Sequence, residues 1–510
     1  MSERDARNEL VWGSENQEKL YAKKILVVGS DILAQMILGG LTGLGINNIY
    51  FMDNNRITRK GTDFLCMHDD FYIGQKKVKH IENMLMRINP SLENVEGIHS
   101  KFSEAFAYPI EPDIIIDATN DTLSKEKTAE YSAKYKVTLI SASSGKGTGM
   151  MANFIPKTLK KINVLQNKPN LENLIFSELS NLPQEPISSG VTAGVVCEEV
   201  RKFVFNYDQQ DLPIKEDSKF IYNLHADTRN EFAKGNTPLY LRDKKVLVVG
   251  AGGIGNFVAL NLALVGIGNI DIVDFDIIEE HNLNRQLLFY EMAGEKKSKV
   301  LSERLRSIDR HVNSNSIYGK VGRIKKEDHA WIKELYEIDS KFWELEDENT
   351  KEPSLPEFKD YLIKHFSSGK SNKHTIGEDY LLEKDYDIIF GCLDNKYSRT
   401  WLNNFAVKNN QTYIDGGTNP KSGQIAVYSP GNTECIDCQL DLKHFKRLPM
   451  HCYQVDGSVV MSNMIIGSAM VGEAMKLFSG NPLKGIFKYN ALSDKRTYVT
   501  NRRIAKNHDC

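Results

Sequence analysis

The chain has 510 residues, of which 41% are hydrophobic and 26% are charged, and its formal net charge at pH 7 is −2. This length is sufficient for two or three domains that each bury a core. The charge gives no overall basic field for nucleic acid or anionic lipid, and no apolar run reaches the roughly 18–20 residues that a membrane-spanning helix needs. Because the N-terminus also lacks the apolar region of a secretory signal, we expect a cytoplasmic protein without nucleic-acid or membrane partners.

A buried strand is expected at the start of the first half, at residues 25–29 (ILVVG), followed by the turn SDIL. A nucleotide-binding domain would carry glycines at this turn, so that its backbone can approach a phosphate. Further strands are expected at 47–53 (NNIYFMD), 113–119 (DIIIDAT) and 138–144 (TLISASS), separated by amphipathic stretches of helical length. This alternation predicts a parallel sheet wound with helices.

The same pattern returns with its glycines in place at residues 246–256 (VLVVGAGGIGN). The alignment that pairs Ile25 with Val246 also pairs Asp53 with Asp274, without a gap between them. Self-similarity that persists in one register indicates that one domain has been duplicated.

The duplication predicts an α/β fold with two doubly wound, Rossmann-like domains, at residues 1–235 and 236–510. Two copies of one such domain are most economically packed as a pseudo-two-fold dimer within one chain.

The alignment of the copies changes register once along the chain. Gly74 aligns with Gly294, but Asp113 aligns with Asp387, so the second copy has gained a segment between these points. The added sequence falls at about residues 325–384, where a charged and mostly helical pattern predicts an inserted subdomain.

The second copy has a G-x-G-x-x-G turn, formed by Gly250, Gly252 and Gly255, between a strand and an apolar helix. Asp274 ends the next strand, nineteen residues after Gly255. Glycines at such a turn let a phosphate approach a helix N-terminus, and a carboxylate at this spacing suits ribose hydroxyls. Taken alone, these features favour an NAD-dependent dehydrogenase.

The residues after the ribose carboxylate disfavour a dehydrogenase. Arg285 and Lys297 add cations that suit a reacting triphosphate, and Asp394 follows a strand where a carboxylate can hold magnesium. Each residue alone has an ordinary explanation, because most such Arg and Lys are solvated surface charges and an Asp-Asn pair after a strand is usually a turn. Hydride transfer needs neither the cations nor the metal ligand, so the ordered set indicates a different chemistry.

In order, spacing and context, these motifs resemble the ThiF/MoeB superfamily and, within it, the activating enzymes of ubiquitin and ubiquitin-like proteins. The resemblance covers both copies and implies ATP and Mg²⁺ as cofactors. It implies the ribose at Asp274, the phosphates at Arg285, Gln286 and Lys297, and the magnesium at Asp394. The other nucleotide contacts expected from it are Gly250, Gly252, Gly253, Gly255, Asp276, Asn282 and Asn395.

By the same resemblance, the first copy is an inactive adenylation domain. Its turn has Ser30, Asp31, Ile32 and Leu33 in place of the glycines, and these bulky side chains are expected to close the approach for a phosphate. Asn120 stands opposite Asp394, so the metal ligand has become an amide. We expect the first copy not to turn over ATP.

The segment before the first strand has the spacing of a family motif, R-Q-L, in which an arginine from one half reaches into the active site of the other. Arg7 is the matching residue, although Asn8 and Glu9 replace the usual Gln and Leu. The alternative is an N-terminal arginine exposed to solvent.

Cys435 and Cys438 form a C-x-x-C pair, and the chain ends with His508 and Cys510. Together they could form a tetrahedral zinc site with three cysteines and one histidine. The resemblance supports zinc, because the family often pairs one C-x-x-C with a second near the C-terminus. The alternative is a loop with two thiols and no metal.

Cys452 lies fourteen residues after Cys438, where the resemblance places the thioester-forming cysteine. Nearby cations would lower the pKa of its thiol and favour the thiolate, and these neighbours are Lys443, His444, Lys446, Arg447 and His451. The alternative is a buried or incidental thiol, which is what we expect of Cys66, Cys197 and Cys392.

The function implied is the ATP-dependent activation of the C-terminal glycine of a ubiquitin-like protein. Adenylation is followed by thioester formation on Cys452 and by transfer to a conjugating enzyme. The compact size resembles bacterial and archaeal versions, including those of antiphage conjugation operons. Two alternatives stay open: a sulfur-carrier or peptide adenylyltransferase that forms no enzyme thioester, and a non-catalytic scaffold that binds nucleotides. The residues expected to be catalytic are Cys452, Arg7, Arg285, Lys297 and Asp394.

Overall fold

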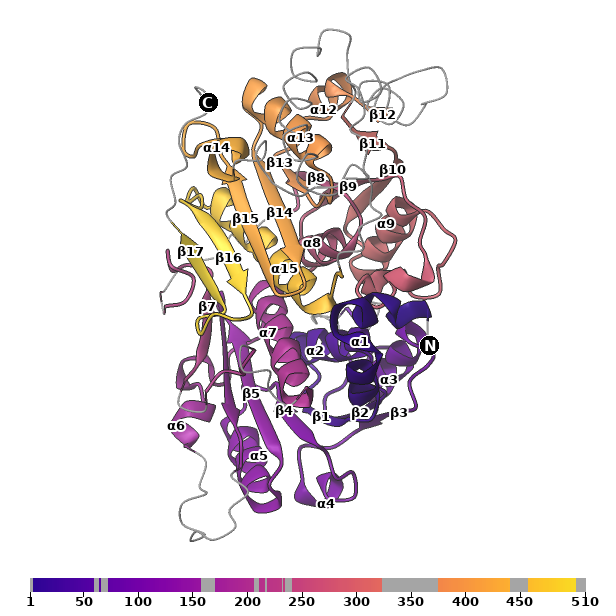
Figure 1. Ribbon diagram of the computed structural model, residues 1–510, viewed down its shortest axis with the longest axis vertical. Coiled ribbons are helices and arrows are strands. Elements are labelled where there is room, and N and C mark those ends of the chain that lie inside the picture. The colour runs from indigo at the N-terminus through magenta and orange to yellow at the C-terminus, as the bar shows by residue number, and fades with distance from the viewer. Residues whose placement is uncertain are drawn as a thin grey trace, which may run out of the picture.

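The computed structural model describes residues 3–58, 64–65, 72–156, 170–205, 211–215, 218–231, 233, 241–322, 375–440 and 457–500. They form two similar halves, one above the other in Figure 1, each built on a sheet covered by helices. No helix in the described ranges is long and apolar enough to cross a lipid bilayer.

The first half is a seven-stranded sheet with the order β3-β2-β1-β4-β5-β6-β7. Neighbouring strands are parallel from β3 to β5, and β6 and β7 extend the sheet in antiparallel pairing. The strands are β1 (Lys24–Val28), β2 (Asn48–Met52), β3 (Asn94–Ile98), β4 (Ile114–Asp117), β5 (Thr138–Gly145), β6 (Thr148–Phe154) and β7 (Phe220–Asn223). The four runs expected as strands are β1, β2, β4 and β5, so these predictions are confirmed.

The second half repeats this plan in an eight-stranded sheet with the order β10-β9-β8-β13-β14-β15-β16-β17. Neighbouring strands are again parallel from β10 to β14 and antiparallel after it. The strands are β8 (Lys245–Val249), β9 (Asn269–Asp274), β10 (Asn313–Tyr318), β13 (Ile388–Gly391), β14 (Tyr413–Asn419), β15 (Ser422–Tyr428), β16 (Ile486–Asn490) and β17 (Thr497–Thr500). Each sheet therefore has an antiparallel edge in addition to the parallel part that the sequence predicts.

The helices cover both sheets and fill the space between them (Figure 1). The first half contains α1 (Ala6–Tyr21), α2 (Ile32–Leu44), α3 (Lys77–Ile88), α4 (Glu104–Ala107), α5 (Thr122–Tyr135), α6 (Leu171–Leu174) and α7 (Pro186–Val204). The second half contains α8 (Gly253–Leu264), α9 (Lys297–Ile308), α12 (Glu378–Lys384), α13 (Lys396–Lys408), α14 (Ile436–Leu440) and α15 (Val460–Phe478).

Four of these helices, α2, α7, α8 and α15, join the halves. They pack against one another, and their buried side chains belong to a single hydrophobic core that includes residues of both sheets. Small residues allow the close approach of α7 and α15, because a Cβ atom on Gly190 would lie 2.0 Å from the Ser468 hydroxyl oxygen. The two domains therefore pack as one body with a shared core, as the duplication predicts.

Most of the predicted insert, residues 325–374, lies outside the described residues, so its helical character stays a prediction. The end of the insert forms β12 (Thr375–Ile376) and α12. β12 pairs in parallel with β11 (Lys320–Val321), which precedes the insert.

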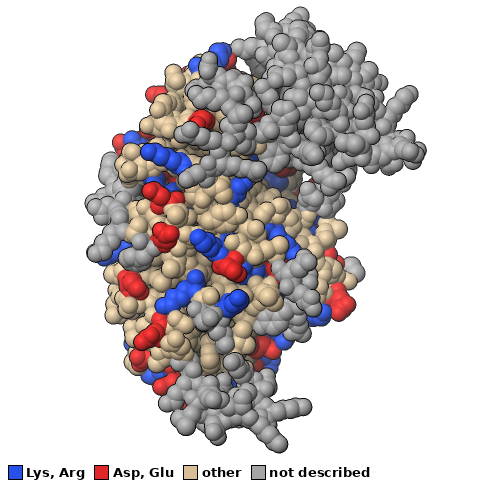
Figure 2. Space-filling model, turned by 60° about the vertical axis from the view of Figure 1, so that its left-hand side comes forward, with Lys and Arg blue, Asp and Glu red and all other residues tan. Residues whose placement is uncertain are grey.

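Acidic and basic side chains are mixed on the face shown in Figure 2. Neither sign forms a continuous field over the part of this face that is described. This distribution agrees with the small net charge of −2.

Two buried ion pairs cross between the halves in opposite directions. Arg229, after β7, donates to Glu473 of α15 from Nε (2.9 Å) and Nη2 (2.7 Å). Arg496, before β17, donates from Nη2 to Glu199 of α7 (2.9 Å). All four side chains are at most 2% exposed. Each half thus supplies the arginine that neutralises a buried glutamate of the other.

We expect Arg229→Ala to lower the free energy of unfolding by about 3 kcal/mol, because it leaves Glu473 buried without its counter-charge. Urea unfolding followed by circular dichroism measures this change. The control is Arg87→Ala, since the Arg87–Glu291 pair also joins the halves but its side chains are 43% and 42% exposed. An exposed pair contributes less than about 1 kcal/mol. Equal losses in the two variants would contradict the stabilising role of the buried pair.

Candidate active site

The glycine-rich turn of the second half joins β8 to α8. Gly250 has φ = +96°, and a Cβ atom on Gly255 would lie 1.9 Å from the Gly250 carbonyl oxygen, so the backbone itself requires both glycines. At Gly252, by contrast, a Cβ atom would meet no described atom within 4 Å. No side chain in the described ranges caps the first turn of α8. The turn therefore leaves open space beside helix N–H groups, as an anion site requires.

Asp274, at the end of β9, is fixed beside this turn. Its Oδ2 accepts a hydrogen bond from the Ala251 N–H and its Oδ1 accepts one from the Asp276 N–H, both at 2.7 Å. Burial raises the pKa of Asp274 to about 6; the charge of Asp276 adds to this effect, and that of Lys297 opposes it. Lys297, the first residue of α9, pairs with Asp276 at 3.0 Å.

Arg285 is a buried cation whose partners among the described residues are all neutral. Its Nη1 donates to the His281 carbonyl oxygen (2.7 Å) and to Asn284 Oδ1 (2.8 Å). Burial, and then the charge of Arg7, lower the pKa of Arg285 to about 10. A buried guanidinium beside a second cation is unfavourable unless an anion joins them. The arrangement therefore fits a bound polyanion.

The N-terminal helix α1 of the first half reaches this same loop. Arg7 Nη2 lies 3.3 Å from His281 Nε2, and Asn284 Nδ2 donates to Asn8 Oδ1 (2.9 Å). Asn8, which replaces the glutamine of the family motif, is thus part of the contact. The structure places Arg7 beside the loop of the other half, while its role in catalysis stays a prediction.

Three further predicted nucleotide contacts lie in the turn and the loop. Gly253 begins α8, and a Cβ atom there would lie 2.7 Å from the side chain of Asn463. Asn282 and Gln286 are buried, and Gln286 Oε1 has no hydrogen-bond partner among the described residues. A buried acceptor without a partner is rare in proteins and fits a site where a ligand donates.

Asp394 and Asn395 lie between β13 and α13. The Asp394 side chain is exposed, whereas Asn395 Oδ1 accepts from the Ser398 N–H (2.9 Å) and caps α13, a role that the sequence did not indicate. Behind them, Arg399 pairs with Asp415. Burial lowers the pKa of Arg399, but the charge and hydrogen bond of Asp415 outweigh it and raise the pKa, with smaller contributions from Tyr413 and then Asp394. An exposed carboxylate at this edge fits Mg²⁺, which proteins bind through one or two carboxylates together with phosphates.

Arg399 was not predicted as a site residue, although the repeat contains a signal for it. After the insert, the register of the two copies pairs Arg399 with Lys125. Lys125 is buried 3.7 Å from Asp117 in the first half. In the alignment of the copies, α5 and α13 therefore carry a buried cation at the same position.

In the first half, polar groups occupy the phosphate end of the turn. Asp31 stands where the second copy has the middle glycine of its turn, and its Oδ1 pairs with Lys77 at 3.0 Å. Gln184 Oε1 accepts from the Leu33 N–H (2.9 Å) in the first turn of α2. Ile32 and Leu33 belong to the hydrophobic core. Of the four residues expected to close this end, Asp31 therefore occupies it with its carboxylate, and the Gln184 amide lies beside it.

The predicted zinc ligands are only partly described. Cys435 and Cys438 are 0% and 2% exposed at the start of α14, and such buried thiols in a C-x-x-C pair fit half of a tetrahedral site. His508 and Cys510 lie outside the described residues. Within the described ranges, no group of three or more His, Cys, Asp and Glu side chains could hold a metal.

Of the remaining four cysteines, two lie among the described residues and two do not. Cys452, the predicted nucleophile, and Cys66 lie outside the described residues. Cys197 and Cys392 are buried, as predicted for core residues, and burial raises the pKa of both thiols.

The pKa of Asp274 predicts a pH-dependent preference for ribose. Above about pH 6 its carboxylate is charged and could accept hydrogen bonds from both ribose hydroxyls, whereas at lower pH it becomes protonated and accepts more weakly. We expect ATP to be preferred over 2′-deoxy-ATP by about 10- to 100-fold at pH 8, and this preference to fall towards unity as the pH falls below 6. The ratio of kcat/KM values measures it, because the phosphates of both nucleotides titrate alike. A ratio that does not change with pH would exclude Asp274 as the ribose ligand.

Comparison with known proteins shows similarity along most of the chain. The description "ThiF family" matches residues 4–237, 229–339 and 367–510. SUMO-activating enzyme subunit 2 of Dictyostelium discoideum is 27% identical over 234 residues, which are 44% of this chain and 27% of that protein. Ubiquitin-like modifier-activating enzyme 5 of the same organism is 24% identical over 277 residues, 53% of this chain and 61% of that protein.

Among solved structures, that of Escherichia coli MccB with AMPCPP and MccA is 22% identical, with a TM-score of 0.36, over 52% of this chain and 66% of that chain. The chain therefore spans from about a quarter to three fifths of the length of the two curated relatives, and about two thirds of this structure.

Proposed function

The chain belongs to the ThiF family, and we propose that its second half uses MgATP to adenylate the C-terminal glycine of a ubiquitin-like protein. The observation that carries the proposal is the buried Arg285, which has no acidic partner among the described residues and lies beside Arg7. A triphosphate is an anion that would compensate both cations. On this proposal, residues 236–510 form the active domain and residues 1–235 the inactive one.

The described contacts support one orientation for the nucleotide. The ribose would lie at Asp274 and the phosphates at the open side of Gly252, within reach of Lys297 and Arg285. Asp394 would hold Mg²⁺, which neutralises phosphate charge when it is bound. The remaining proposed contacts are Gly250, Gly253, Gly255, Asp276, Asn282, Gln286 and Asn395.

In the first step, a carboxylate oxygen of the terminal glycine attacks the α-phosphorus of ATP. The bond from that phosphorus to the oxygen bridging to the β-phosphate breaks, and pyrophosphate leaves with the electron pair. Arg285 and Arg7 would stabilise the negative charge that spreads over the phosphate oxygens. The product is an acyl adenylate.

In the second step, the Cys452 thiolate attacks the carbonyl carbon of this adenylate. The carbon–oxygen bond to AMP breaks, AMP leaves, and the acyl group is held as a thioester. The thiol of a conjugating enzyme then takes over the acyl group by exchange. Zinc at Cys435, Cys438, His508 and Cys510 would have a structural role.

ATP–pyrophosphate exchange tests the proposal. With a ubiquitin-like protein that ends in glycine, we expect exchange and a covalent adduct that a thiol reductant cleaves. Exchange without an adduct would favour a sulfur-carrier or peptide adenylyltransferase. The absence of exchange with any glycine-terminated partner would favour the non-catalytic scaffold.

We expect Arg7→Ala to slow pyrophosphate exchange by about 10²-fold, because one cation of the phosphate site is lost. The control is Lys19→Ala in the same helix, where the cation pairs with the exposed Glu15 and should leave the rate unchanged. Rates are measured at saturating ATP, after circular dichroism has shown that both variants are folded. An unchanged rate in Arg7→Ala would make this arginine a solvated terminal residue.

A further inference from the structure

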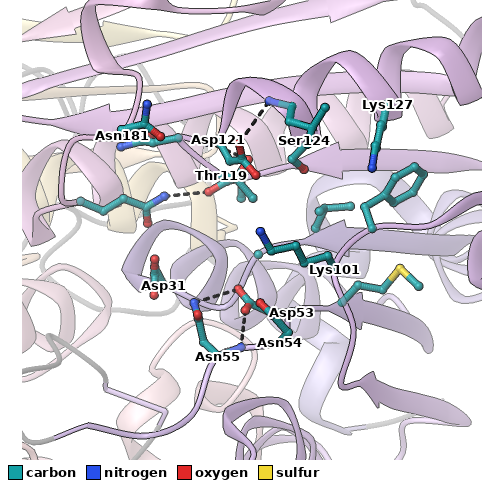
Figure 3. Close-up of a pocket in the computed structure, with 18 of the residues that line it drawn as sticks. Asp31, Asp53, Asn54, Asn55, Lys101, Thr119, Asp121, Ser124, Lys127 and Asn181 are labelled. Atoms are coloured by element: carbon teal, nitrogen blue, oxygen red, sulfur yellow. Dashed lines mark hydrogen bonds between the residues drawn. The ribbon is translucent and has the colours of Figure 1, made fainter.

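A cavity of about 350 Å³ opens in the inactive first half, at the carboxyl ends of β1, β2 and β4 (Figure 3). The order of the sheet is β3-β2-β1-β4-β5, so the chain reverses direction across the sheet between β1 and β4. This reversal is where doubly wound sheets bind ligands, and the volume is sufficient for a small organic molecule. The loss of the glycine turn has therefore not filled the site.

The carboxylate proposed to bind ribose in the second half has a counterpart in this cavity. Asp53 follows β2 as Asp274 ends β9, and the two carboxylates align between the copies. Asp53 Oδ1 accepts from the Asn55 N–H at 2.6 Å, in the same way that Asp274 Oδ1 accepts from the Asp276 N–H. Asp53 lines the cavity, and Figure 3 shows its carboxylate at the cavity wall. A carboxylate held in this way suits two vicinal hydroxyls.

The phosphate end, in contrast, already contains an anion. The Asp31 carboxylate lies 3.0 Å from Lys77, which aligns with Lys297 of the second half. Lys77 is 5% exposed, whereas the Asp31 side chain is 56% exposed, so the buried ammonium group is paired with a carboxylate at the cavity surface. The Leu33 N–H at the start of α2 also donates a hydrogen bond to Gln184 Oε1 (2.9 Å). The lysine and one helix N–H that could have met a phosphate are thus occupied by the protein itself.

The charged side chains around the cavity also disfavour a phosphate. Three carboxylates and two ammonium groups border the cavity: Asp31, Asp53, Asp121, Lys101 and Lys127. With Lys77, the partner of Asp31, these groups are balanced in number, but the group that lies at the position of the phosphate is the Asp31 carboxylate. A phosphate placed beside Asp31 would be repelled.

The remaining wall is apolar and suits a flat base. Met52, Phe102 and Leu123 lie along it. Phe102 is 6% exposed and fixed in the core, while Leu123 is 53% exposed at the rim. An aromatic ring with a few fixed polar groups is the usual composition of a small-molecule site.

We propose that the first half binds an uncharged ribonucleoside in this cavity, with its ribose hydroxyls on Asp53, and rejects the corresponding nucleotides because Asp31 occupies the phosphate position. The base lies against Phe102 and Met52. The proposal does not depend on which carboxylate the second half activates.

Calorimetric titration of the full chain with adenosine, guanosine, cytidine and uridine tests the proposal, with a non-hydrolysable ATP analogue present in excess to fill the second half. We expect one of these nucleosides to bind with a stoichiometry of one per chain, and its 5′-monophosphate to bind at least about tenfold more weakly. Asp53→Asn should weaken the nucleoside by about tenfold or more. Asp274→Asn, titrated without the analogue, should keep this binding.

Two more variants separate the site from effects on folding. Leu123→Trp adds bulk at the exposed rim and should abolish nucleoside binding while pyrophosphate exchange continues. Asp31→Gly should raise the affinity for the monophosphate relative to the nucleoside by about tenfold or more, because Lys77 becomes available. The proposal is overturned if none of the four nucleosides binds at millimolar concentration, or if binding is unchanged in both Asp53→Asn and Leu123→Trp.

Discussion

In Cys452→Ala, we expect the reductant-sensitive adduct with the ubiquitin-like protein to disappear completely, while pyrophosphate exchange stays within a few-fold of the wild-type rate. An acyl adenylate reacts much better with a thiolate than with a hydroxyl, so a single cysteine can carry all of the adduct. Adenylation itself needs no thiol. The adduct is measured by non-reducing electrophoresis and mass spectrometry after incubation with MgATP.

The matched control is Cys197→Ala, which removes a buried thiol from the first half and should leave the adduct intact. If the adduct persists in Cys452→Ala, or is mapped to Cys435 or Cys438, the proposed nucleophile is wrong. The zinc site would then also have to be abandoned, because a ligand thiolate would be the reacting group.

Asp394→Ala should lower pyrophosphate exchange by at least about 10³-fold, since the loss of the proposed magnesium ligand leaves the phosphate charge without its metal. The Asp394 side chain is exposed, so we expect little change in the free energy of unfolding. Exchange is measured with increasing Mg²⁺, and a shift to a higher Mg²⁺ requirement in Asp394→Asn would link the loss to the metal.

Asn120→Ala is the counterpart in the first half and should have the opposite pattern. Asn120 Nδ2 donates to the carbonyl oxygens of Ser144 (2.8 Å) and Leu182 (2.7 Å), so its removal leaves two acceptors unpaired. We expect the free energy of unfolding to fall by about 1–2 kcal/mol and exchange to change by less than about twofold. Loss of exchange in Asn120→Ala would mean that the first half takes part in ATP chemistry.

Much of the fold can be predicted from the sequence, because parallel strands buried on both faces leave continuous apolar runs. Such runs predicted β1, β2, β4 and β5. The alignment of the copies extended the same prediction to the second half. The antiparallel strands β6 and β15 were not recognised, since glycine, serine and polar residues interrupt their apolar pattern.

The candidate site was predictable where its chemistry lies in one short segment, as for the glycine turn and Asp274. Contacts between distant segments were not, because no local pattern specifies them. The pairing of Asp31 with Lys77 joins two separate helices of the first half, and that of Arg7 with His281 joins the two halves. The position of Arg7 was expected only from a family resemblance. Asp31 was expected to help close the first half's phosphate end by its bulk, but its pairing with Lys77 was not predicted.

The two reciprocal pairs, Arg229–Glu473 and Arg496–Glu199, have a consequence for how this sequence can change over generations. A duplicated domain that has lost its original chemistry would ordinarily accumulate mutations freely or be deleted. Here each copy holds the buried counter-charge of the other. A deletion of the first copy would therefore expose Arg496 and leave Glu473 in the second copy without its arginine. The two copies should therefore be retained together, and mutations that impair the protein should also be found in the first copy, far from the glycine-rich turn of the second.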